Sequence, residues 1–121
     1  MDKKEIIYGT VPSKSNSYKI IKLGNHCSLC KTSAMKKYEE SFYIQLSSDL
    51  RGKMIEGFFE FYIDVYYPSM RSDLDGSLKG VLDCLQKTKT IKNDNRCSKI
   101  VARKFIDKSN PRIEFTILEV D

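Results

Sequence analysis

The sequence lacks any apolar run long enough to cross a membrane. It also lacks the hydrophobic segment of a secretion signal, because the charged opening of residues 1–5 leads directly into the short run Ile6-Ile7-Tyr8. These absences argue against a membrane-spanning protein and against an exported one. We therefore expect a cytoplasmic protein with no membrane partner.

Internal repeats, low-complexity stretches and interdomain linkers are also absent from the sequence. A chain of 121 residues without such boundaries is typical of one compact domain, and it is long enough to bury a hydrophobic core. We expect residues 1–121 to form a single domain.

Ligands for zinc are scarce. The chain has a single histidine, His26, and four cysteines, of which Cys27 and Cys30 form a Cys-x-x-Cys pair. Such a pair is half of a zinc site, but a closed site needs four well-placed ligands and the sequence has no second pair. Ordinary reduced cysteines are the better interpretation. A small zinc-binding interaction protein is the weaker alternative.

Positive charge exceeds negative charge, with a formal net charge of +5 at pH 7. This excess favours a polyanionic partner, although a basic charge that only keeps a protein dispersed is the alternative. The cations crowd one stretch, which holds Lys87, Lys89, Lys92, Arg96, Lys99, Arg103 and Lys104. Such a cluster suits the binding of phosphate groups.

Hydrophobic periodicity divides the chain into strands and two main helices. The predicted elements are strands over residues 4–9, 55–67, 98–106 and 112–120, a hairpin of residues 18–23 and 27–31 around Gly24-Asn25, and helices from about residue 33 to 46 and from 74 to 85. Residues 88–95 are predicted to form a polar loop. This order indicates an α+β fold, with a single small domain in which a mixed sheet of about four to six short strands packs against two main helices.

Two apolar patterns identify the expected core. Spacing of three and four residues places one set on a helix face, namely Met35, Tyr38, Phe42 and Leu46. Strict alternation places another set on one face of a strand, namely Phe59, Phe61, Ile63 and Val65. Both sets are predicted to be buried.

Residues 71–94 gather acidic side chains within this basic chain. The aspartates grouped around Lys79 are Asp73, Asp75, Asp83 and Asp94. Carboxylates that lie close together repel one another, so such a cluster persists mainly where a cation holds it. Mg²⁺ and Mn²⁺ prefer oxygen ligands and bridge carboxylates to substrate phosphates. An acidic metal site in basic surroundings indicates a nuclease.

The spacing within this segment predicts that one helix face is polar. Asp75, Lys79 and Asp83 follow at four-residue steps, so their side chains share a face. The adjoining apolar stripe, predicted to pack on the core, consists of Leu74, Leu78, Leu82 and Leu85. Asp73 lies just before the helix, where a carboxylate is favoured and where it can reach the same cation as Asp75.

Each of these residues also has an ordinary interpretation. Asp73 and Asp75 can be helix-capping residues, Lys79 and Asp83 a solvated ion pair, and Asp94 part of a turn. It is their combination at this spacing that favours a metal site.

The segment resembles the RusA-type Holliday-junction resolvases. The run Asp73-Leu74-Asp75, followed by Lys79, Asp83 and Asn93-Asp94, is similar to the family's pattern of two aspartates, a lysine, a further aspartate and an Asp-Asp pair. Near the N-terminus, Val11-Pro12-Ser13-Lys14-Ser15-Asn16-Ser17-Tyr18 resembles the family's Pro-Ser-x-Asn-x-x-Tyr-like opening. The two matches bracket most of the chain. Gly76 and Asn93 depart from the pattern, because many members have Asn and Asp there.

The resemblance implies a homodimeric, Mg²⁺-dependent endodeoxyribonuclease, with Mn²⁺ able to substitute. Such an enzyme resolves branched DNA, the four-way junction, by paired symmetric nicks in recombination or repair, and resolvases of this type are commonly prophage-borne. A twofold dimer suits paired nicks because it places two identical sites symmetrically.

The resemblance also implies roles for individual residues. Asp73, Asp75 and Asp94 are the expected metal ligands, and Lys79 stabilises charge on the scissile phosphate or orients the attacking water. Asp83 either binds a metal through water or, as we favour, holds Lys79 in an ion pair, and Asn93 supports the site. Candidate DNA contacts, chosen by position and charge, are Lys14, Asn16, Arg71, Lys87, Lys89, Lys92, Arg96 and Lys99.

The departures at Gly76 and Asn93 leave a second function open. A catalytically weak relative would bind branched DNA by its structure without cutting it.

Overall fold

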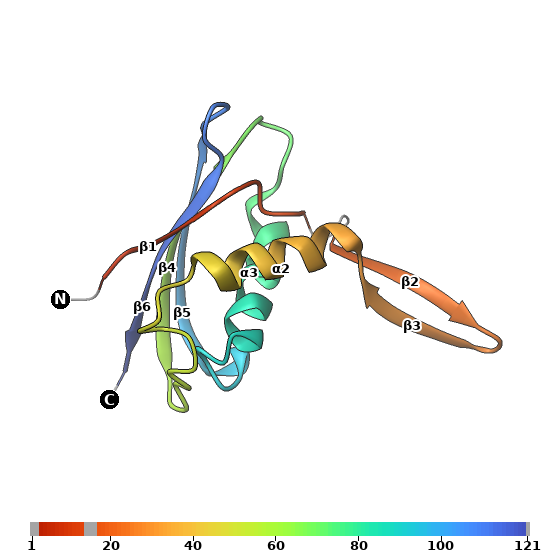
Figure 1. Cartoon of the computed structure of the whole chain (residues 1–121), viewed down its shortest axis with the longest axis horizontal. Helices are drawn as coiled ribbons and strands as arrows, with labels where there is room; N and C mark the ends of the chain where they lie inside the picture. The colour runs from red at the N-terminus through yellow and green to blue at the C-terminus, as the bar shows by residue number, and fades with distance from the viewer. Residues whose placement is uncertain (1–2, 14–16, 121) are drawn as a thin grey trace.

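A mixed four-stranded sheet carries two α-helices on one face, and a separate β-hairpin projects sideways from this body (Figure 1). This computed structural model describes residues 3–13 and 17–120. Its elements are β1 (Glu5–Tyr8), β2 (Tyr18–Leu23), β3 (His26–Lys31), α2 (Ser33–Gln45), β4 (Phe59–Tyr67), α3 (Leu74–Lys87), the 3₁₀ turn η1 (Asp94–Arg96), β5 (Cys97–Ile106) and β6 (Arg112–Glu119). The predicted α+β class is confirmed.

The order of strands in the sheet is β1-β6-β4-β5. β4 pairs with β5 in parallel and with β6 antiparallel. Parallel neighbours need a long crossover connection, and α3 provides it between β4 and β5. β5 therefore lies at one edge of the sheet, where β4 is its neighbour among the described strands.

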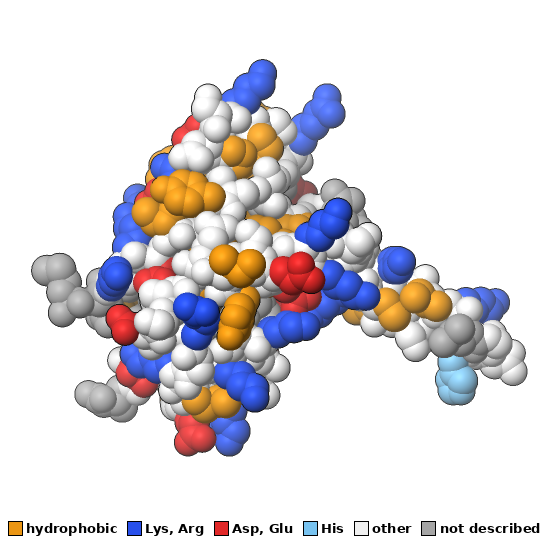
Figure 2. Space-filling view, viewed as in Figure 1, with side chains coloured by type: hydrophobic (Ala, Val, Ile, Leu, Met, Phe, Trp, Pro, Cys, Tyr) orange, Lys and Arg blue, Asp and Glu red, His pale blue; other side chains and the backbone are white. Residues whose placement is uncertain are grey.

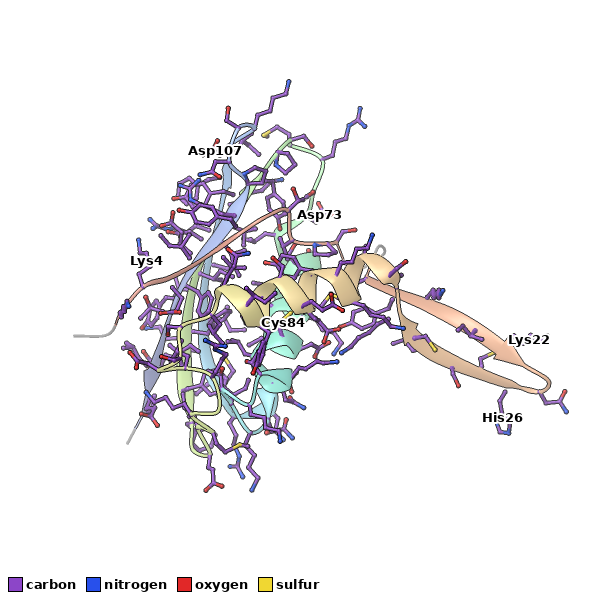
Figure 3. All side chains as sticks on the ribbon, viewed as in Figure 1. Lys4, Lys22, His26, Asp73, Cys84 and Asp107 are labelled. Atoms are coloured by element: carbon purple, nitrogen blue, oxygen red, sulfur yellow. The ribbon has the colours of Figure 1, made fainter. Side chains whose placement is uncertain are left out.

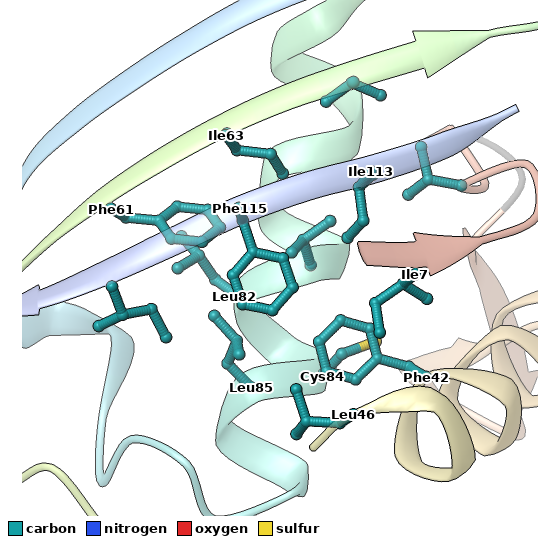
Figure 4. Packing of buried hydrophobic residues seen from close by; sticks show 14 of the residues in the cluster. Ile7, Phe42, Leu46, Phe61, Ile63, Leu82, Cys84, Leu85, Ile113 and Phe115 are labelled. Carbon is teal, nitrogen blue, oxygen red and sulfur yellow. The ribbon is translucent and has the colours of Figure 1, made fainter. Parts of the chain in front are cut away.

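The core lies between the sheet and the two helices (Figure 4). β4 buries alternate residues from Phe59 to Tyr67, as its alternation predicted. The aromatic ring of Phe115 in β6 stacks on Phe42 of α2, with centroids 5.9 Å apart, and contacts Phe61 at 5.8 Å. These rings join the sheet to α2.

Helix α3 packs on the core through the predicted leucine stripe and also through small residues beside it. Leu82 and Leu85 belong to the core and Leu74 and Leu78 pack against it. The other buried residues of the helix are Ser77, Gly80, Val81 and Cys84. The small residues are buried because α3 lies close to other elements on that side. A Cβ atom at Gly80 would lie 3.4 Å from Met35 Cε of α2, and the hydroxyl groups of Ser77 and Tyr67 lie 2.6 Å apart.

The sequence predicted the hairpin and most strands closely, but β4 begins at Phe59 rather than at residue 55. Ile55 instead forms an isolated parallel bridge with Ile91, in the segment that follows α3. That segment was predicted to be a polar loop. Thr88, Thr90 and Ile91 are nevertheless buried in it. Their burial is possible because polar groups of the segment are paired: Ile55 exchanges backbone hydrogen bonds with Thr90 and Lys92, and the hydroxyl groups of Thr88 and Thr90 bond to each other.

Within the described residues, no helix is both long enough and apolar enough to cross a membrane.

We predict that Phe115→Ala destabilises the protein by about 3–5 kcal/mol, because truncating a buried ring leaves a cavity between the sheet and α2. Urea unfolding followed by circular dichroism measures this free energy. The control is Ile44→Ala on α2, whose side chain is 75% exposed, and it should shift the free energy by no more than about 0.5 kcal/mol. Equal effects of the two variants would contradict the packing of Phe115 between the sheet and α2.

Candidate active site

A groove of about 780 Å³ opens between the N-terminal end of α3 and the base of the hairpin. It joins acidic, basic and apolar side chains from three parts of the chain. Its lining consists of Ser13, Tyr18, Ile20, Leu29, Arg71, Ser72, Asp73, Asp75, Gly76 and Lys79. The structure thus brings four predicted site residues together: Asp73, Asp75, Lys79 and Arg71.

The two aspartates lie at the start of α3. Asp73 occupies the N-cap position, yet its side chain makes no capping hydrogen bond, and Asp75 lies in the first turn. Both side chains are exposed to the groove. The positive end of the helix dipole favours negative charge at this place. The capping interpretation therefore does not account for the Asp73 carboxylate, which faces the groove instead.

Side chains of the sheet hold the loop before α3 by hydrogen bonds to its backbone. The Tyr67 hydroxyl donates a hydrogen bond to the backbone carbonyl of Asp73 at 3.2 Å. Lys104 Nζ, from β5, donates to the carbonyl oxygens of Met70, at 3.0 Å, and of Ser72. Burial is the main cause that raises the pKa of Tyr67, and the nearby Asp73 raises it further. The hydroxyl thus stays protonated and keeps donating to the backbone of the loop.

Asp83 connects α3 to the hairpin. Its Oδ1 lies 3.5 Å from Lys79 Nζ, in the ion pair four residues apart that the sequence predicted. Its Oδ2 accepts a hydrogen bond from the Tyr18 hydroxyl. Burial and this bond to Asp83 raise the pKa of Tyr18 well above its usual value, so Tyr18 remains a donor at any physiological pH. Asp83 thereby positions both Lys79 and the first residue of β2.

The hairpin has a second anchor on α2. Lys31, the last residue of β3, pairs through Nζ with Glu39 Oε2 at 3.0 Å. Backbone hydrogen bonding also closes the base, from Thr32 N–H to the Ser17 carbonyl at 2.9 Å. One strand of the hairpin is thus fixed to each helix.

Asp94 and Asn93 lie at the opposite end of α3. The backbone N–H of Asp94 donates to Gln86 Oε1 at 3.1 Å, and Gln86 is in the last turn of the helix. At about 1.5 Å per residue, the last turn lies roughly 16 Å along the axis from Asp75. Asn93 caps the 3₁₀ turn by accepting from Asn95 N–H at 3.0 Å. Within one chain, the structure does not bring Asp94 to Asp73 and Asp75.

The groove offers two carboxylates for a metal ion. Mg²⁺ is commonly held by one or two carboxylates together with waters and substrate phosphates, so Asp73 and Asp75 fit this donor set. Over residues 3–13 and 17–120, no group of three or more His, Cys, Asp or Glu side chains is placed to hold a metal. Cys27 and Cys30 are three residues apart on β3, so they face opposite sides of the hairpin and do not share a ligand position.

The remaining predicted DNA contacts are dispersed. Lys87 pairs with Glu39 at 3.5 Å, and Lys92 pairs with Glu56 at 3.9 Å. The others lie beyond the C-terminal end of α3 or on the open face of the sheet, namely Lys89, Arg96 and Lys99. Lys14 and Asn16 lie outside the described residues.

Sequence reasoning assigned no role to Tyr18, Ile20 or Leu29, which complete the groove. Tyr18 belongs to the N-terminal motif, and this was the one available signal. Ile20 and Leu29 gave no such signal. The side chains of a short hairpin alternate between its two faces whether or not one face is covered by another element.

Two carboxylates, a lysine and an arginine converge on this groove, and phosphodiester-cleaving enzymes use side chains of these kinds. The family model described as Endodeoxyribonuclease RusA matches residues 10–118, so the chain belongs to the RusA endodeoxyribonuclease family. A search of curated proteins gives no match. Family membership supports nuclease activity and a branched-DNA substrate.

We predict that Tyr18→Phe loosens the hairpin without unfolding the body, because it removes the hydrogen bond to Asp83. Hydrogen exchange measures this effect as faster exchange of the β2 and β3 amides. The matched control is Tyr62→Phe, whose hydroxyl bonds Glu60 on the sheet, and it should leave hairpin exchange unchanged. Unchanged exchange in Tyr18→Phe would show that Asp83 does not anchor the hairpin.

Proposed function

We propose that this protein is a Mg²⁺-dependent endonuclease that resolves four-way DNA junctions by paired symmetric nicks, with Mn²⁺ able to substitute. The observation that carries the proposal is the convergence of Asp73, Asp75, Lys79 and Arg71 on one groove. Membership of the RusA family supports the same activity.

Each groove residue has a separate role in the proposed phosphodiester cleavage. Asp73 and Asp75 hold the cation, and their place at the helix N-terminus favours negative ligands and phosphate alike. When bound, Mg²⁺ supplies charge neutralisation at the phosphoryl oxygens and a more acidic water. Lys79, oriented by Asp83, stabilises charge on the scissile phosphate, and Arg71 binds phosphate at the rim.

We further propose a homodimer formed through β5. An edge strand presents unpaired backbone groups that a second chain can bind. β5 is a ten-residue edge strand, and its exposed large hydrophobic residues are Ile100 (43%), Val101 (40%), Phe105 (36%) and Ile106 (43%). Antiparallel pairing with the partner's β5 around a twofold axis would cover these side chains and extend the sheet.

This pairing also accounts for the remote position of Asp94. Asp94 lies just before β5 begins, whereas Lys104, near the end of β5, holds the loop that leads to Asp73. Antiparallel pairing brings the start of one β5 beside the end of the other. Asp94 of one chain would then approach Asp73 and Asp75 of the second chain as the third ligand, and Lys92 and Arg96 would bring positive charge to the same groove.

We predict that Asp75→Asn abolishes nicking of a mobile four-way junction in both Mg²⁺ and Mn²⁺, because a neutral amide binds the cation more weakly than a carboxylate. Junction binding in EDTA should persist. Labelled strands on denaturing gels record the nicks, and mobility shift records binding.

The matched control is Asp49→Asn, an exposed aspartate that lies outside the groove, and it should cut like the wild type. Wild-type protein that binds junctions but cuts none with either metal would replace the proposed enzyme by a structural reader of branched DNA.

We predict that a mixture of Asp75→Asn and Asp94→Asn chains regains nicking that neither variant has alone. In a mixed dimer, one groove would carry both substitutions, and the other would combine intact Asp73 and Asp75 with an intact Asp94. Such a dimer makes single nicks in place of paired cuts. If each groove used its own chain's Asp94, both grooves of the mixed dimer would be damaged and the mixture would stay inactive.

A further inference from the structure

The β2–β3 hairpin is an arm that the proposed chemistry has not used. It extends away from the sheet and the helices, with Lys22 and His26 near its tip (Figures 1 and 3). An isolated two-stranded hairpin is marginally stable in water. This one is fixed at its base by the Tyr18–Asp83 and Lys31–Glu39 contacts, so its outer part is placed in a defined direction from the groove.

One face of the arm continues the lining of the groove. The strand pairing places Tyr18 opposite Lys31, Ile20 opposite Leu29, and Lys22 opposite Cys27, and alternation puts all of these on one side. Tyr18, Ile20 and Leu29 line the groove together with Asp73 and Asp75. Outward from the carboxylates, this face therefore presents an aromatic ring, an apolar pair and then a lysine.

Both side chains of the apolar pair are largely exposed. Ile20 is 74% exposed and Leu29 is 65% exposed. Figure 2 shows hydrophobic side chains on the arm with lysine or arginine on either side of them. Scattered apolar residues are common on surfaces, but a cross-strand pair at the mouth of a catalytic groove is placed to contact whatever enters the groove.

The positive charge of the arm indicates a polyanionic partner. Residues 18–31 include Lys19, Lys22 and Lys31 and contain no aspartate or glutamate. Such a segment complements a polyanion. From Tyr18 to Lys22 the strand advances by about 13 Å, which is roughly four steps of 3.4 Å along a DNA strand.

We propose that the Ile20–Leu29 pair is an apolar wedge that packs against unstacked bases at the branch point, next to the scissile phosphate, while Lys22 binds the phosphates of the adjoining DNA arm. The proposal rests on the proposed junction-cleaving function and adds a structural determinant of junction selectivity to it. Apolar side chains in other DNA-binding proteins insert between base steps in this manner, and the cost of unstacking is lowest where bases are already weakly stacked. Branch points meet that condition and continuous duplex does not.

The test compares Ile20→Ser/Leu29→Ser with wild type on a four-way junction that carries 2-aminopurine at the branch point, in EDTA to prevent cleavage. Wild-type protein should raise the fluorescence, because the base loses its stacking. The double variant should leave the fluorescence near that of free junction and bind the junction about tenfold more weakly. Its affinity for linear duplex should be unchanged. The control is Ile21→Ser, on the opposite face of the hairpin, which should behave like wild type.

Two outcomes would overturn the wedge. One is a double variant that unstacks the branch point and prefers junctions as wild type does. The other is a double variant that sediments as a monomer where wild type is a dimer, because the pair would then contact a second chain rather than DNA. If the wild-type protein neither bound nor cut junctions, that result would contradict the proposed function and therefore also the wedge.

A second variant keeps the proposal testable if the double variant fails to fold. Lys22→Gln should lower the slope of log K against log salt for junction binding by about one unit. The matched control is Lys4→Gln, beside β1 at the far edge of the sheet, and it should leave the slope unchanged. An unchanged slope in Lys22→Gln would show that DNA does not follow the arm.

Discussion

The packing of α3 against β4 is the constraint on which the rest of this structure depends. Ser77, Gly80 and Cys84 let the helix lie close to Tyr67 and Met35, and this close approach sets its rotation about its own axis. With the rotation set, Asp75 and Lys79 can only face outward, toward the hairpin. Burial also raises the pKa of the Cys84 thiol to about 12, so this cysteine serves as a small core residue rather than as a nucleophile. The position of the candidate active-site groove is therefore a consequence of helix packing.

Much of the fold could be predicted from local patterns. Alternation identified β4, helical spacing identified α2, and Gly24-Asn25 identified the hairpin. The polar stripe of α3 was also predicted, since it requires only the helical period. The burial of Ser77, Gly80 and Cys84 was not predicted, because the leucines alone marked the buried face and the small residues widen it. Composition alone does not tell which of two neighbouring faces will meet a second helix.

Long-range placement accounts for what the sequence could not predict at the site. Asp94 follows α3 closely along the chain, but the length of the helix and the hydrogen bond to Gln86 place it at the far end from Asp73 and Asp75. The contact between Tyr18 and Asp83 joins residues that are distant in sequence, and no periodic pattern links them. Conversely, the Lys79–Asp83 pair was predictable because it is local to one helix.

The two contacts of Asp83 couple the arm to Lys79 in the groove. The hairpin is about 20 Å long, and its described side-chain anchors, Tyr18–Asp83 and Lys31–Glu39, lie at its base. The Asp83 carboxylate that accepts the hydrogen bond from Tyr18 also holds the Lys79 ammonium. A displacement of the arm would therefore be transmitted to Lys79 through one hydroxyl group and one carboxylate, with no change in the core.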